Sequence, residues 1–221
     1  MKKLFVSIGV CLISLSTVAQ VKFKLTDTIG KWNQGNLYRD SLKQEFIQQE
    51  ITKKINAARV KKGMKPLISD IGLKPAAVHN AIYNRYCFAH DIHSTWSYST
   101  MTHFQNVDIP NFTEIVDPWA RISLLDRTKF AGITENLTLS LILGTSLTFQ
   151  QVIDIAVGDF AHSLPHWESL TEHEQWDAMY VYYDLHTGSL CEPMTYSYTD
   201  GTTNTIYPMN VIVYVILGDY K

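Results

Sequence analysis

The chain has 221 residues, of which 19 are basic and 21 acidic, with 46% hydrophobic residues and a formal charge of −2. This length suits one domain with an ordinary hydrophobic core. A balanced charge provides no basic surface for a polyanion, so we expect no nucleic-acid partner.

An export signal is predicted over residues 1–19. Lys2 and Lys3 give a positive start, an apolar run follows, and small residues surround a cleavage point after Ala19. The apolar run is short for a membrane span. We therefore expect a secreted or periplasmic protein with no membrane span after cleavage; the alternative is an uncleaved segment that anchors the chain.

Two cysteines, Cys87 and Cys191, lie beyond the predicted signal. Export permits a disulfide between them, and two free thiols are the alternative. Two cysteines do not make a disulfide framework, so the hydrophobic core is expected to supply the stability.

The first regular element is expected after an extended lead-in over residues 20–41. Asp40 or Ser41 is a suitable helix cap, and Gly63 suits the position after the last turn. Between them, apolar residues recur at helical spacing. These residues are Ile47, Ile51, Ile55 and Ala58.

A second helix is expected from Ser69 or Asp70 towards Tyr86, with Pro75 tolerated in its first turn. Residues 91–131 are rich in Ser, Thr, Asp and aromatic residues, and we expect a long loop there, with short helices around 119–125.

A third helix is expected from Thr148 to Phe160, where Thr148 and Gln151 match a capping box. Strand signals then gather over residues 179–183 and 211–217, and two more segments flank a hairpin turn at Asp200-Gly201. Helices first and strands last predict an α+β fold with a mainly antiparallel sheet.

Several short segments, in their order along the chain, resemble one family of secreted proteins. They are Ile55-Asn56-Ala57-Ala58-Arg59, Phe88-Ala89-His90, Gly132-Ile133-Thr134-Glu135-Asn136-Leu137 and Ser163-Leu164-Pro165-His166. They resemble motifs of the CAP superfamily, the cysteine-rich secretory, antigen 5 and pathogenesis-related proteins with an SCP-like domain. The resemblance implies that residues 42–221 form a three-layer α-β-α sandwich, with an inserted loop at about 91–131.

The resemblance also implies that His90, Glu135 and His166 line one polar cleft. A further acidic member is expected on the preceding helix, with Asp154 as the first candidate and Asp159 as the second. Such a group can bind a metal, exchange protons or form a satisfied polar network. We expect a divalent cation such as zinc to be optional, held by His90 and His166, and no cofactor to be required.

The leading functional hypothesis is a secreted CAP-domain protein that binds a lipid or other small apolar ligand, or a protein partner. The alternative is a hydrolase, a peptidase or esterase that uses the same His/Glu cleft. The motifs His-Glu-x-x-His and Gly-x-Ser-x-Gly are absent, so no catalytic residue is assigned. A third hypothesis makes the loop at 91–131 a contact surface with exposed aromatic residues. These are Trp96, Tyr98, Phe104, Phe112 and Trp119.

Overall fold

In the computed structural model, helices and two strands occupy the described chain up to residue 171, and the last four described elements, between residues 178 and 220, are all strands. No helix in the described parts combines the length and the apolar character needed to cross a membrane. The described parts are residues 22–29, 37–89, 103, 105, 109, 112, 115, 117–143, 147–187, 194–197, 199–206 and 208–221. The predicted export signal, His90 and Cys191 lie outside them.

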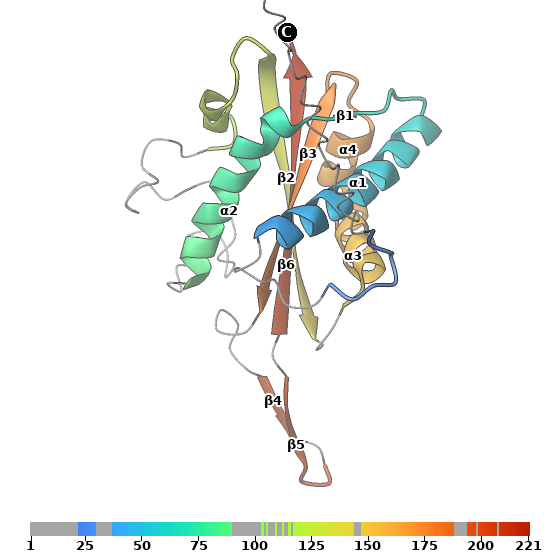
Figure 1. Ribbon diagram of the computed structural model, residues 1–221, viewed down its shortest axis with the longest axis vertical. Coiled ribbons are helices and arrows are strands. Elements are labelled where there is room, and N and C mark those ends of the chain that lie inside the picture. The colour runs from blue at the N-terminus through green and yellow to red at the C-terminus, as the bar shows by residue number, and fades with distance from the viewer. Residues whose placement is uncertain are drawn as a thin grey trace, which may run out of the picture.

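A four-stranded sheet forms the middle layer, and helices cover both of its faces (Figure 1). Its strand order is β1-β3-β6-β2, in which only the β1–β3 pair is parallel. The α+β class and the mainly antiparallel sheet are thus confirmed. The elements are α1 Leu37–Lys61, β1 Ile68–Ser69, η1 Ile71–Leu73, α2 Lys74–Ala89, η2 Ala120–Leu124, β2 Phe130–Leu143, α3 Phe149–His162, α4 Leu164–Thr171, β3 Ala178–Thr187, β4 Met194–Ser197, β5 Thr203–Ile206 and β6 Pro208–Tyr220.

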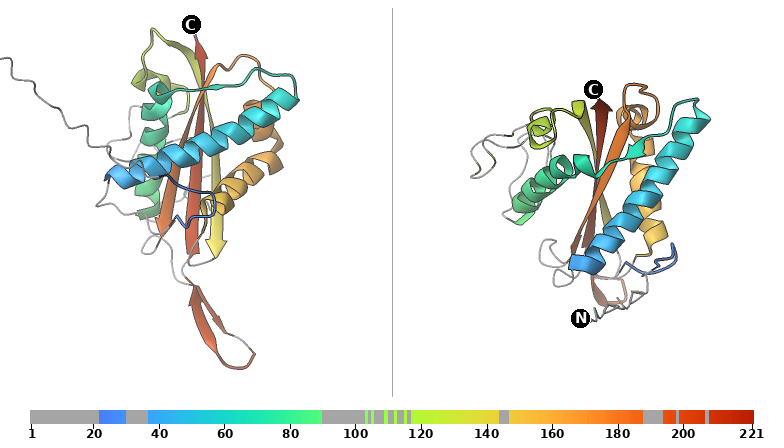
Figure 2. Two further views of the ribbon diagram at one scale, coloured as in Figure 1. Left: turned by 45° about the vertical axis from the view of Figure 1, so that its right-hand side comes forward. Right: turned by 45° about the horizontal axis from the view of Figure 1, so that its top comes forward.

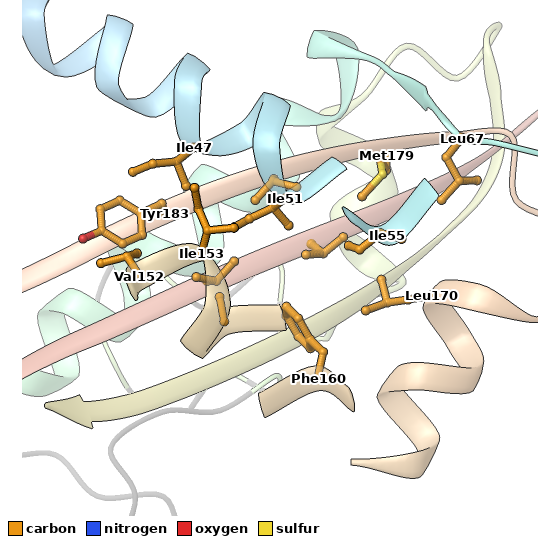
Figure 3. Close-up of a cluster of buried hydrophobic side chains, with 14 of the residues drawn as sticks. Ile47, Ile51, Ile55, Leu67, Val152, Ile153, Phe160, Leu170, Met179 and Tyr183 are labelled. Carbon is orange, nitrogen blue, oxygen red and sulfur yellow. The ribbon is translucent and has the colours of Figure 1, made fainter. Parts of the chain in front are cut away.

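One hydrophobic core lies between the sheet and the helices α1, α3 and α4 (Figures 1 and 3). The predicted stripe of α1 supplies Ile47, Ile51 and Ile55, none of which has any exposed surface. Strand β3 contributes alternate residues, as the two-residue period of a strand requires. Burial of this stripe therefore holds α1 on the sheet.

A second core lies on the opposite face, beneath α2 and η2 (Figure 2). Strand β6 divides its apolar run between the two cores. Val213, Val215 and Leu217 face the first core, and the alternate residues face the second. This explains the unbroken apolar sequence, because a strand covered on both faces has no solvated side.

The ends of three predicted helices agree with the structure to within a few residues. Helix α1 starts at Leu37, before the predicted cap, and ends at Lys61, and Gly63 follows it with a φ of 79°. The capping box of Thr148 and Gln151 is formed at the start of α3. Three elements were not predicted, the short strand β1, the strand β2 and the short helix α4.

The described part of the lead-in, residues 22–29, packs on the domain. The ring of Phe23 lies 5.2 Å from that of Phe149, and Ile29 is buried. The backbone N–H of Ile29 donates to Leu147, and the buried Lys43 ammonium donates to the carbonyl of Ile29. This segment is therefore part of the folded domain.

The side chain of Gln44 completes the hydrogen bonding of β3 where its neighbour β1 has ended. Strand β1 pairs with β3 only as far as Met179. Beyond it, the Gln44 amide donates to the carbonyl of Val181 at 3.0 Å and accepts from the N–H of Tyr183 at 3.2 Å. A side chain of α1 thus takes the place of a strand.

Cys87 is a free, buried thiol. Burial raises its pKa, with a small opposing effect from a hydrogen bond with Tyr83. The structure therefore agrees with the free-thiol alternative for Cys87, whereas Cys191, the predicted disulfide partner, lies outside the described residues.

Two glycines provide a matched test of packing around the sheet. A methyl group added at Gly218 would lie 2.9 Å from Leu73 and 3.0 Å from Phe130, whereas one at Gly158 in α3 would meet no atom within 4 Å. We expect Gly218→Ala to lower the free energy of unfolding by about 1–3 kcal/mol. Gly158→Ala is expected to raise it by roughly 0.5–1 kcal/mol, since alanine favours a helix. Urea denaturation of both variants checks this, and equal effects would contradict the packing argument.

Candidate functional site

A buried carboxylate, that of Glu135 on β2, is the centre of a polar network on the α2 face of the sheet. One of its oxygens accepts hydrogen bonds from Asn80 at 2.9 Å and from His103 Nδ1 at 2.8 Å. Since an ionised carboxylate only accepts, Nδ1 of His103 carries the proton of this hydrogen bond, and Nε2 makes no hydrogen bond within the described residues. We call Glu135, Arg121, Asn80 and His103 the Glu135 cluster.

Arg121, from η2, neutralises the charge of this carboxylate. Its Nη1 lies 3.1 Å from each oxygen of Glu135, and both side chains are almost fully buried. Its Nη2 donates to Asn80 at 3.0 Å and to the backbone carbonyl of His103 at 2.7 Å. One guanidinium thus connects the segment that carries His103 to both α2 and β2.

A second imidazole, that of His166, reaches the cluster from the other face of the sheet. Glu135 faces α2, whereas its neighbour Asn136 donates to Ser169 of α4 at 3.3 Å. His166 lies on α4, yet the ring centroids of His103 and His166 are 6.3 Å apart. Because β2 is the last strand of the sheet, the two histidines meet around its outer edge.

The structure brings together two of the predicted site residues, Glu135 and His166, through His103. His90 lies outside the described residues. Asp154 is exposed on α3, where it pairs with Lys54 of α1 at 3.1 Å and accepts from Gln150.

Asp159, the second acidic candidate, faces β2. Its carboxylate accepts from Thr138 at 3.1 Å and from Ser140. Its described contacts therefore lie along the α3 side of the edge strand, and they do not include the Glu135 cluster.

Three members of the cluster were missed in the sequence, namely Asn80, His103 and Arg121. Asn80 is on the predicted second helix, but no sequence motif marks it as a buried polar residue. The other two lie in the inserted segment, where no period indicated which side chains turn inwards. A buried carboxylate on β2 requires a buried cation or hydrogen-bond donors nearby. This requirement is the one signal in the sequence that could have indicated the three residues.

The aromatic residues of the inserted segment divide between core and surface. Phe112 is buried and packs edge-on against Tyr83 of α2, with ring centroids 5.1 Å apart. Trp119 is 63% exposed. The remaining three aromatic residues of the contact-surface hypothesis lie outside the described residues.

Two histidines near the cluster favour their neutral forms. Burial lowers the pKa of His166, and the nearby His103 lowers it further. Burial, followed by the charge of Arg121, lowers the pKa of His79, while Glu135 opposes this. His79 accepts from Gln105 through Nδ1 at 3.1 Å, which suits a neutral ring.

Stability should consequently fall in acid. Below the ordinary histidine pKa of 6.5, the unfolded chain takes up protons that folded His166 and His79 resist. The contribution of the two neutral histidines to the free energy of unfolding is complete above pH 6.5 and decreases as the pH drops below it. Urea denaturation should give a lower free energy of unfolding at pH 5.5 than at 7.5. The difference in the free energy of unfolding between the two pH values should be smaller in His166→Gln. An unchanged difference would show that His166 does not contribute to the pH dependence.

The donor set suits part of a zinc site. Imidazole nitrogens are common zinc ligands, and within the described residues Nε2 of His103 and the ring of His166 make no hydrogen bond. The described residues contain no group of three or more His, Cys, Asp or Glu able to hold a metal. Two imidazoles would supply at most two of the four ligands of a zinc site, and the described residues provide no third.

No protein-family model matches the chain, and no curated protein matches it. Two solved structures are similar to it. One is an outer surface protein from Borrelia burgdorferi, at 18% identity and a TM-score of 0.43, covering 78% of this chain and 92% of that one. The other is an extracellular protein containing a SCP domain from Bacillus anthracis, at 14% identity and a TM-score of 0.45, covering 83% of this chain. The present chain spans 44% of the Bacillus chain.

Proposed function

We propose that this chain is an exported binding protein of the CAP type, which holds its ligand at the imidazoles of His103 and His166. The supporting observation is the orientation of His103. Glu135, in its buried ion pair with Arg121, accepts the hydrogen bond from Nδ1 of His103. This leaves Nε2 available beside His166. Export rests on the predicted signal at residues 1–19.

The ligand class follows from the surroundings of the two rings. His166 packs edge-on against Phe160, with ring centroids 6.0 Å apart, and Phe160 is fully buried, so this imidazole lies at the border of the apolar core. A small, mainly apolar molecule such as a lipid, or a side chain of a protein partner, matches this combination when it carries one polar group. A divalent cation such as zinc, shared by the rings, would supply a bond to that group.

Calorimetric titration of the exported protein with zinc tests the metal part of this proposal. We expect binding to the unmodified protein and its loss in His103→Ala plus His166→Ala. His90→Ala separates the two candidates for the first imidazole, because it should retain binding if His103 is the ligand. Asp154→Asn, which alters an exposed carboxylate on α3, is the matched control. Equal heats in all proteins would contradict the proposal.

A hydrolase is the second candidate, favoured by the 2.8 Å hydrogen bond between His103 and Glu135. A carboxylate that holds Nδ1–H leaves Nε2 as a proton acceptor, the arrangement of a general base. A panel of peptide and ester substrates distinguishes the two functions. Turnover that disappears in His103→Gln and in Glu135→Gln would establish the hydrolase, whereas binding predicts no turnover.

A further inference from the structure

The net charge of the Glu135 cluster differs from that of an ordinary pair in which a carboxylate alone accepts a hydrogen bond from an imidazole. A carboxylate behind a metal-binding histidine usually adds negative charge and strengthens the bond from histidine to metal. In this protein the same carboxylate already faces a guanidinium, with Arg121 Nη1 at 3.1 Å from both oxygens. With side-chain exposures of 0% and 1%, water screens neither partner.

The geometry points to Arg121 as a positioning residue that acts through Glu135 and keeps the affinity of the His103–His166 pair for divalent cations low. This inference rests on the proposed function of that pair. Arg121 makes no described contact with His166 and meets His103 only at its backbone carbonyl. Its influence on the two partly buried rings is therefore exerted through the charge and the orientation of Glu135.

Orientation and charge have opposite effects, which makes the inference testable. Through Nη2, Arg121 holds Asn80 and the backbone of His103, and this favours binding. Its positive charge cancels that of Glu135 and disfavours a cation. In a site with little water the charge effect should exceed the loss of orientation. Removing the charge should then tighten cation binding, whereas a purely structural residue would weaken it when altered.

Zinc affinity measured by competition with a chromophoric chelator distinguishes these effects. Arg121→Gln removes the charge but retains an amide donor, and we expect about tenfold tighter binding or more. Arg121→Lys restores the charge without the guanidinium fork, so its affinity should be within threefold of the unmodified protein, which is roughly 0.7 kcal/mol. Arg121→Gln combined with Glu135→Gln is neutral again and should lose the gain.

Equal or weaker binding by Arg121→Gln than by Arg121→Lys would overturn the inference. Circular dichroism first establishes that each variant is folded. If Arg121→Gln is not, Glu135→Gln provides the converse test. It leaves the guanidinium unopposed and should bind zinc at least roughly tenfold more weakly; unchanged affinity would overturn the inference. The proposed function fails separately, if the unmodified protein binds no zinc while Arg121→Gln does.

Discussion

Replacing Arg59 by Met should lower the free energy of unfolding by about 3–6 kcal/mol. Arg59 lies on α1 with no exposed surface, and its guanidinium donates to three backbone carbonyls, those of Lys65, Leu170 and His173, at 2.8–3.1 Å. The variant leaves all three acceptors without this donor. A buried acceptor that loses its partner costs about 1–3 kcal/mol, and water can reach some of these groups.

Urea denaturation at pH 7.5 measures this effect. Lys54→Met is the matched control, because it also removes a cation from α1 but breaks only an exposed ion pair with Asp154. That control should change the free energy of unfolding by less than about 1 kcal/mol. A similar small change for Arg59→Met would show that the three carbonyls do not depend on the guanidinium.

Breaking the ion pair of the Glu135 cluster is the other change with a large expected effect. Arg121→Met leaves the carboxylate of Glu135 buried and without its counter-charge, which typically costs about 3–5 kcal/mol. The double variant Arg121→Met plus Glu135→Leu removes both charges. It should recover most of that loss, because a well-packed apolar pair often replaces a buried ion pair at little cost.

A double-mutant cycle from urea denaturation gives the coupling between the two residues. We expect the two single variants to sum to a larger loss than the double variant shows. Strictly additive losses would mean that Arg121 and Glu135 stabilise the protein independently. Both single variants should also loosen the inserted segment, because Arg121 holds the backbone of His103 and Glu135 holds its imidazole. Limited proteolysis would detect this.

The parts of the fold that were predicted are those whose pattern lies within one element. The isoleucines of α1 and the capping box of α3 are local signals, and so is the apolar run of β6. Strand β2 was missed although Leu137, Leu139 and Leu141 alternate with polar residues. Glu135 and Asn136 interrupt this alternation, and polar residues on both sides of an edge strand weaken the strand signal.

The candidate site was harder to predict, because its contacts join residues that are distant along the chain. Glu135 and His166 are predicted as site residues only by the resemblance to the CAP superfamily. His103 and Arg121 come from a segment without a period, and their positions depend on tertiary packing around a buried charge. The short helix α4 follows a break at Ser163, so the histidines at 162 and 166 do not share one helix, as Pro165 indicated.

Gln44 has a consequence for the behaviour of the protein at high concentration. The unpaired edge of a strand is a template on which a second molecule can extend the sheet, and this is a common route to aggregation. At Val181 and Tyr183 that template is already occupied by an amide from α1. Gln44→Leu would keep the helix but free this edge, and the variant should be more prone to self-association than its loss of stability alone would explain.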